Sequence, residues 1–146
     1  MLPVINTWNE EVMPLMEWNE ALALDGGVID DTHKEFVELL NRMHEAPDDE
    51  LLDILDQFIS HTESHFGQEQ RWMEELEFPP LSCHVGEHEG VLEIAREVRR
   101  RAAAGDAGYG KVLAKGVAEW FANHATSMDL MLAQYIKERG YVPTAE

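Results

Sequence analysis

Apolar residues recur every three or four positions through most of this chain, and no segment alternates apolar with polar residues as a half-buried strand does. An α-helix turns once in about 3.6 residues, so this spacing gathers the apolar side chains on one helix face. Helix-terminating residues separate the periodic segments: Pro47, the pair Pro79-Pro80, the turn 105–108, and Gly140. The pattern predicts helices at about residues 30–46, 48–76, 82–104 and 110–139.

Each helix is expected to turn its apolar stripe toward a common core. Asp30 and Asp31 stand at the start of the first helix, where carboxylates can cap the backbone. Short connections favour antiparallel neighbours, so the expected fold is all-α, an up-down-up-down antiparallel four-helix bundle with an N-terminal arm. In the third helix, the residues expected to face inward are Val91, Leu92, Ile94, Ala95 and Val98.

The 146 residues are enough for one domain with a single buried core. Residues 1–28 contain several prolines and glycines and show no sustained helical period, so we expect an arm packed on the bundle. Trp8 and Trp18 are the expected anchors of this arm. The bundle is expected to occupy residues 29–140, followed by a C-terminal tail at 141–146.

Composition narrows the function classes. The formal net charge of -18 argues against binding nucleic acid or an anionic membrane surface, since both attract Lys and Arg. The single cysteine, Cys83, excludes an internal disulfide and suits a reducing compartment. The N-terminal residues lack the pattern of a signal peptide, and no segment has the apolar length of a membrane span. The expected location is therefore the cytoplasm.

Five of the seven histidines stand in spacings typical of metal ligands. Residues four apart on a helix share one face and can grip one ion. Histidine and carboxylate are the common ligands of iron, zinc and copper. The side chains that follow this pattern come from all four predicted helices: His33, His65 with Glu69, His84 with His88, and His124 with Asp129.

Five imidazoles and two carboxylates exceed the four ligands of a structural zinc site. If both carboxylates and one solvent oxygen bridge two six-coordinate metals, a single coordination position stays open. An odd number of histidines therefore predicts an asymmetric metal pair with one place for a ligand. The spacing of five between His124 and Asp129 would put them about 140° apart on a regular helix. We therefore expect a widened, π-like turn between Ala125 and Asp129.

This set of spacings closely resembles the hemerythrin family, in particular its single-domain bacterial members. The resemblance covers about residues 18–140. It rests on Trp18, Ile29-Asp30-x-x-His33, His65-Phe66-x-x-Glu69 with Met73, His84-x-x-x-His88, and Trp120-x-x-x-His124-x-x-x-x-Asp129.

The resemblance implies two non-haem Fe ions with an oxo or hydroxo bridge and O2 binding at one of them. Carried over by position, His84, His88 and His124 would hold one iron, and His33 and His65 the iron with the open place. Glu69 and Asp129 would bridge the two ions. The apolar walls of the ligand pocket would come from five residues: Phe36, Phe66, Trp120, Phe121 and Met128.

Two departures from the family pattern bear on function. Phe121 stands where relatives often have Leu, beside the O2 side, which affects ligand access and oxidation rate. His61 stands where relatives often have Tyr, one helical turn before His65. We interpret His61 as a residue behind the ligands that contacts them without binding metal, in preference to an extra ligand.

Three functions compete at this stage. The first is reversible O2 binding for storage, delivery or sensing, without catalysis. The second is a di-iron redox enzyme that handles peroxide or NO, and the third is a regulatory or partner-binding bundle. A nitrogen-rich, nearly saturated site favours the first, since oxidases of the ferritin-like kind use Glu-x-x-His pairs that this chain lacks. The lack of His-Glu-x-x-His argues against a zinc hydrolase. An additional protein partner is left open.

Overall fold

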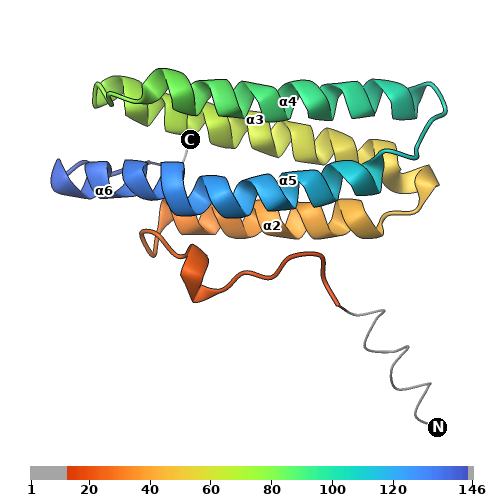
Figure 1. Cartoon of the computed structure of the whole chain (residues 1–146), viewed down its shortest axis with the longest axis horizontal. Coiled ribbons are helices and arrows are strands. Elements are labelled where there is room, and N and C mark those ends of the chain that lie inside the picture. Colours follow the sequence, from red (N-terminus) through yellow and green to blue (C-terminus); the bar gives the residue numbers. More distant parts are fainter. Residues whose placement is uncertain (1–12, 145–146) are drawn as a thin grey trace, which may run out of the picture.

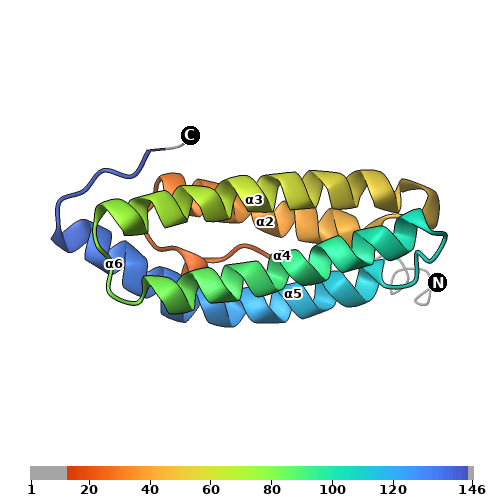
Figure 2. The same ribbon diagram turned by 90° about the horizontal axis from the view of Figure 1, so that it is seen from above.

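The structure is a computed structural model that describes residues 13–144. Within these residues every regular element is helical, and the long helices lie side by side as a bundle (Figures 1 and 2). The expectation of an all-α four-helix bundle is confirmed, with α5, η3 and α6 together forming the fourth rod. The elements are η1 (Glu20–Leu22), α2 (Val28–Glu45), η2 (Asp48–Glu50), α3 (Leu51–Glu75), α4 (Leu81–Ala103), α5 (Gly110–His124), η3 (Ala125–Asp129) and α6 (Leu130–Glu138).

The start of α2 differs from the sequence-based expectation. The capping carboxylate is Asp25, whose oxygens accept hydrogen bonds from the backbone N–H groups of Gly27, Ile29 and Asp30 at 2.8–3.1 Å. Asp30 lies inside the first turn, where its buried carboxylate accepts two 2.7 Å hydrogen bonds from Leu24 and Gly26. Hydrogen bonds thus run in both directions between the loop and the first turn of α2, and they fix the direction in which α2 enters the bundle.

The apolar core falls into two clusters along the bundle axis. One cluster includes Phe36 and Phe58, and the other includes Trp72 and Leu132 near the opposite end. On each of the four rods, buried histidines or carboxylates lie at the boundary between these clusters. Water is therefore excluded on two sides of this polar layer, which strengthens the electrostatic interactions inside it.

Ile94 does not face the core. Its side chain is 60% exposed, whereas its neighbours Val91 and Ala95 are buried. The sequence pattern placed it inward because it continues an apolar run, but the facing positions on α5 do not close over it. This exposed residue borders a groove described below.

The described part of the N-terminal arm contacts the bundle. Trp18 and Met16 pack against the larger apolar cluster, and the side chain of Asn41 exchanges two hydrogen bonds with the Met16 backbone at 2.8 and 2.9 Å. The ammonium group of Lys34 lies 5.5 Å from the centre of the Trp18 ring. Trp8 lies outside the described residues. Every helix of residues 13–144 is too short or too polar to cross a membrane.

Candidate metal centre

The structure brings all seven side chains of the sequence-based ligand set into one buried layer. His33 comes from α2, the His65/Glu69 pair from α3, the His84/His88 pair from α4, and His124 and Asp129 from the ends of α5 and η3. Each is at most 5% exposed. Their metal-binding atoms form two groups, each with its atoms within 4.8 Å of one another: His84, His88, His124 and Asp129, and His33, His65 and Glu69.

The Glu69 carboxylate divides its two oxygens between these groups. Its Oε2 lies 2.8 Å from His65 Nε2 and 3.7 Å from His33 Nε2. Its Oε1 lies 3.3 Å from His84 Nε2 and 3.5 Å from His88 Nε2. A carboxylate in this position can give one oxygen to each of two metal ions.

Asp129 does the same from the opposite side. Its Oδ1 lies 3.0 Å from His84 Nε2 and 3.1 Å from His124 Nε2, while its Oδ2 lies 3.3 Å from His33 Nε2. Both carboxylates therefore span the boundary between the three-histidine and the two-histidine group. This arrangement suits an asymmetric pair of cations.

The π-like turn expected between His124 and Asp129 is confirmed. Residues Ala125–Asp129 form a π-helix, which adds one residue to a turn and brings both side chains to the same face. The hydroxyl groups of Thr126 and Ser127 donate hydrogen bonds to backbone carbonyls one turn earlier, at 2.7 and 2.6 Å. These bonds satisfy backbone oxygens next to the widened turn.

When no metal is bound, protons on some of the buried histidines balance the negative charges of the two buried carboxylates. Burial lowers the pKa of His33 and His84, but the adjacent Asp129 and Glu69 carboxylates outweigh burial and raise both pKa values to about 9. Burial raises the pKa of each carboxyl group, but the surrounding histidines outweigh it and lower both. Burial is the main cause that lowers the pKa of His88 to about 3.

Buried polar atoms without hydrogen-bond partners show that the residues fit a cation. Both ring nitrogens of His33 and the Oε1 atom of Glu69 are buried and accept or donate no hydrogen bond in the described structure. An unsatisfied buried polar group costs about 1–3 kcal/mol. A metal ion between the histidine Nε2 atoms and the carboxylate oxygens would satisfy these electron pairs, and the nitrogen-rich donor set suits iron, zinc or copper.

Comparison with known proteins agrees with this geometry. The family model described as "Hemerythrin HHE cation binding domain" matches residues 27–136. The chain belongs to the hemerythrin family. The bacteriohemerythrin of Ralstonia nicotianae is 46% identical over 128 residues, covering 88% of this chain and 93% of that protein. The bacteriohemerythrin of Stenotrophomonas maltophilia is 30% identical over 129 residues, covering 86% and 84%.

Solved structures show the same fold. A crystal structure of a hemerythrin mutant superposes on this chain with a TM-score of 0.77 at 24% identity, covering 84% of this chain and 98% of that one. A second mutant structure gives the same TM-score, 0.77, at 25% identity. The two-carboxylate layer of this hemerythrin-family chain therefore sits in a known bundle architecture.

Glu87 is a contact that the sequence reasoning missed. Its Oε1 lies 2.8 Å from His124 Nδ1 and also accepts a 3.2 Å hydrogen bond from Trp120 Nε1. The Trp120 ring stacks on His124, with centroids 4.3 Å apart and planes at 20°. Glu87 precedes His88 directly, but nothing in the sequence shows that it reaches across to the fourth rod. It orients a ring that the family resemblance makes a ligand.

The five residues expected to wall the pocket lie on two different sides of the metal centre. Phe36 and Phe121 lie beside the two-histidine group, with ring centroids 4.9 Å apart and Phe121 edge-on to His33 at 5.0 Å. Phe66 stacks on His88 at 3.7 Å and lies 5.4 Å from His65.

Trp120 and Met128 lie on the three-histidine side. Trp120 covers His124, and Met128 lines a small cavity of about 60 Å³ next to His84. Phe36 and Phe121 therefore lie next to the open place that the resemblance implies, and Phe66 contacts one histidine of each group. The other two residues cover the three-histidine group.

His61 lies behind the two-histidine group. Its ring centroid is 6.2 Å from that of His65 and 6.5 Å from that of Phe36, and its Nδ1 lies 3.9 Å from a Glu35 oxygen. Its Nε2 is buried without a hydrogen-bond partner. Burial is the main cause that lowers the pKa of His61, so the ring is neutral near pH 7. His61 also lines a solvent-open hollow of about 500 Å³.

Proposed function

We propose that this protein binds O2 reversibly at two non-haem iron ions joined by an oxo or hydroxo bridge. The observation that carries the proposal is the division of the Glu69 and Asp129 oxygens between a three-histidine and a two-histidine group. Unequal nitrogen counts leave one group with fewer ligands, and a metal ion held by that group would keep one coordination position open. Membership in the hemerythrin family supports the same assignment.

In the proposed site, His84, His88 and His124 would hold one iron, and His33 and His65 would hold the other. Glu69 and Asp129 would each serve both ions. When bound in the reduced form, the iron pair supplies the electrons and the coordination place that O2 requires. The histidine Nε2 atoms point into the layer, so each ring must carry its remaining proton on Nδ1.

The side chains around the two-histidine group keep water away from it. Phe36 and Phe121 are at most 1% exposed and pack against each other and against His33. Neither carries a proton donor. Dry surroundings slow the proton transfer that accompanies irreversible oxidation, so this wall favours release of O2 over its consumption.

We also propose the wider setting of this site. The metal-binding domain is assigned to residues 29–140, with residues 1–28 as an arm and 141–146 as a tail. We assign the protein to the cytoplasm and give it no nucleic-acid or membrane partner, in accord with its net charge of -18 and its single cysteine. Storage, delivery and sensing of O2 all use the same chemistry at the site.

Two stoichiometries test the proposal. Chelator-treated protein is titrated with Fe(II) without oxygen, and a break at two ions per chain is expected. Gas uptake by the loaded protein should then reach one O2 per chain and reverse on purging. A break at one ion, or uptake that does not reverse, would contradict the assignment.

The surroundings of His61 favour a second candidate function, a redox enzyme for peroxide or NO. Its partnerless Nε2 lies next to His65, and its ring borders a hollow open to solvent. This is a route by which protons can reach the site. Replacing His61 with Phe should leave the iron content unchanged. A parallel loss of peroxide or NO turnover would support the enzyme, whereas unchanged turnover would exclude a role for His61 in it.

A further inference from the structure

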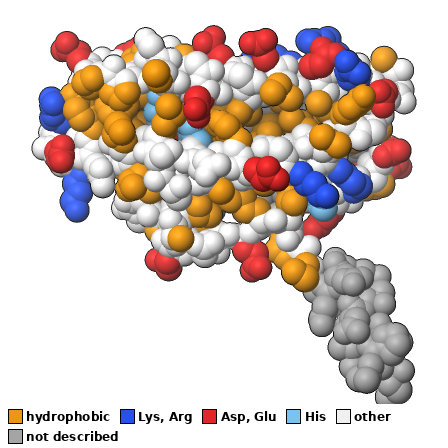
Figure 3. Space-filling view, in the orientation of Figure 1, with side chains coloured by type: hydrophobic (Ala, Val, Ile, Leu, Met, Phe, Trp, Pro, Cys, Tyr) orange, Lys and Arg blue, Asp and Glu red, His pale blue; other side chains and the backbone are white. Residues whose placement is uncertain are grey.

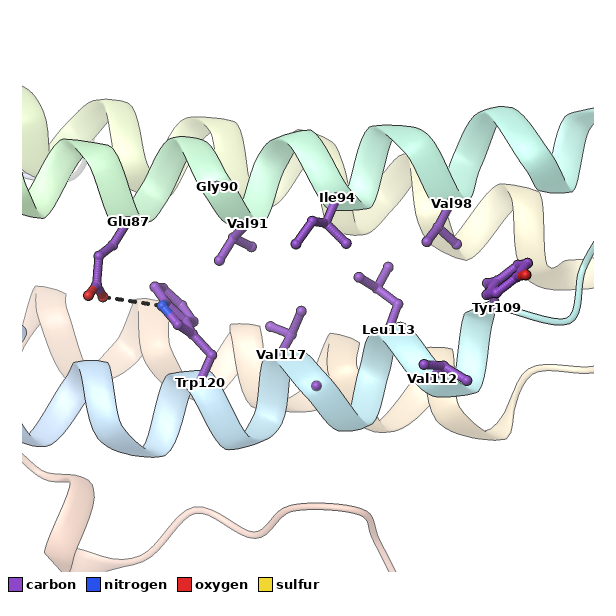
Figure 4. Close-up of a pocket in the computed structure, with 11 residues that line it drawn as sticks. Glu87, Gly90, Val91, Ile94, Val98, Tyr109, Val112, Leu113, Val117 and Trp120 are labelled. Carbon is purple, nitrogen blue, oxygen red and sulfur yellow. Dashed lines mark hydrogen bonds between the residues drawn. The ribbon is translucent and has the colours of Figure 1, made fainter.

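An apolar groove of about 530 Å³ runs between α4 and α5, beside the metal centre (Figures 3 and 4). We call it the α4–α5 groove. Val91, Ile94 and Val98 line it from α4, and Leu113 and Val117 from α5. Its volume lies within the range of about 300–1,000 Å³ that is common for small-molecule sites. Ile94 and Val112 on its rim are 60% and 64% exposed, so large apolar side chains face solvent here.

Two glycines keep this groove wide. Gly90 on α4 and Gly116 on α5 both line it, and a Cβ atom added to either would meet nothing within 4 Å. Glycine inside a helix costs about 1 kcal/mol relative to alanine. Packing within the chain gives no reason for that cost, because alanine would fit at both positions. The space above the two glycines is the feature that a larger side chain would remove.

The two ends of the groove differ in charge. One end is formed by Glu87 and Trp120, and the Oε2 atom of Glu87 accepts no hydrogen bond in the described structure (Figure 4). At the other end lies Tyr109, with the Arg101 guanidinium 5.1 Å from its ring centre. Arg101 and Arg100 share the Glu97 carboxylate, and Asp106 also interacts electrostatically with Arg101. The two cations at this end are therefore balanced by two carboxylates. A single carboxylate therefore marks one end of an otherwise apolar channel.

We propose that the α4–α5 groove binds a linear amphiphile whose cationic head pairs with Glu87 and whose apolar tail lies along Val91, Ile94 and Val98. The span from Glu87 to Val98 is roughly 17 Å at 1.5 Å per residue, which suits a chain of about twelve carbons. A second copy of this protein is a poorer occupant, because two chains of net charge -18 repel each other. The proposal does not depend on which metal occupies the neighbouring site.

Calorimetric titration of the metal-loaded protein with dodecylamine, below its micelle concentration, tests this site. One molecule per chain is expected to bind. Dodecanoate, which has the same tail and an opposite charge, should bind at least tenfold more weakly. Equal affinity for the two probes, or no saturable binding of dodecylamine, would overturn the proposal.

Glycine variants locate the binding. Gly116→Leu fills the groove and should lower the dodecylamine affinity at least tenfold. Gly67→Leu is the matched control, because Gly67 is a helical glycine on α3 with equally open space and lies outside the groove. Unchanged affinity in Gly116→Leu would place the amphiphile elsewhere. A dimer in sedimentation that Gly116→Leu dissociates would assign the groove to a second copy and also overturn the proposal.

Discussion

The His124 ring donates a hydrogen bond from Nδ1 to Oε1 of Glu87 across 2.8 Å. The other ring nitrogen, Nε2, faces Asp129 Oδ1 at 3.1 Å inside the buried layer. The ring is thus held at both ends, and a carboxylate behind a histidine ligand increases its basicity. Trp120 adds a stacked face and shares the same carboxylate oxygen.

Replacing Glu87 with Ala should weaken metal binding by about 10- to 100-fold, the range found when such supporting carboxylates are removed. Competition with a chelator measures this loss. The control is Glu93→Ala, an exposed position on the same helix. Urea unfolding of the metal-free proteins separates positioning from folding. Glu87 is 43% exposed, and losing it as the acceptor for His124 should lower the free energy of unfolding by no more than about 1–3 kcal/mol. Wild-type metal affinity in Glu87→Ala would exclude the positioning role.

Metal binding should release protons at neutral pH. The pKa values of His33 and His84 are raised to about 9, so both rings are protonated at pH 7 in the metal-free protein. A metal ion must displace these protons before it can bind Nε2. Metal affinity should therefore rise with pH up to about 9 and level off above it. Titration in weakly buffered solution measures the release, and a pH-independent affinity would contradict it.

The stability of the metal-free protein should have the opposite dependence on pH. Because the folded-state pKa values of His33 and His84 exceed 6.5, their contribution is complete below pH 6.5 and is lost as the pH rises through about 9. Because the pKa values of Glu69 and Asp129 are lowered, these carboxylates stabilise the folded protein above pH 4.5 and pH 3.8, the ordinary pKa values of the two groups. This stabilisation is lost on acidification. Urea unfolding should give a maximum between these limits. Stability that increases from pH 6.5 to pH 9 would contradict the layer's charge balance.

Phe121→Ala should accelerate irreversible oxidation of the iron-loaded protein. The Phe121 ring is 1% exposed and lies edge-on to His33, so its removal leaves a cavity beside the two-histidine group. Phe-to-Ala changes in cores also cost about 3–5 kcal/mol. Phe121→Leu keeps most of the volume and serves as the comparison. The rate of spectral change in air measures the effect. Equal rates in the wild type, Phe121→Ala and Phe121→Leu would show that Phe121 does not protect the site from oxidation.

Inserting an alanine after Thr126 should destroy the metal pair. The π-helix at Ala125–Asp129 already contains one residue more than a regular turn, and this aligns His124 with Asp129. A further residue rotates α6 by about 100° relative to α5, which displaces its buried residues Leu132 and Ile136. Iron content should fall to one ion per chain or fewer, while Thr126→Ala, which keeps the length, should retain two. Two ions in the insertion variant would show that the length of the widened turn does not matter.

Local spacing was enough to predict the helices and the buried layer. His65 with Glu69 and His84 with His88 share helix faces by period alone, and the five-residue step from His124 to Asp129 required a π-turn that the structure contains. These features depend on neighbours within one helix. The residue that caps α2 was harder to predict. Asp25 lies in a loop, and the conformation of a loop leaves no repeating apolar pattern in the sequence.

Contacts between helices were not predictable in the same way. Ile94 was expected to face inward, but it borders the α4–α5 groove. The apolar pattern of one helix does not determine how close the next helix lies. Glu87 was missed because its partners, His124 and Trp120, lie 37 and 33 residues away. Such relationships depend on the rotation of each helix in the bundle.

The visible spectrum of one iron-loaded sample tests reversible O2 binding most directly. The sample is reduced without oxygen, exposed to air, and then purged, over several cycles. We predict a coloured form that appears in air and fades on purging with little loss between cycles. A one-way change to an oxidised spectrum, or the absence of an iron-dependent band, would contradict reversible O2 binding at this centre.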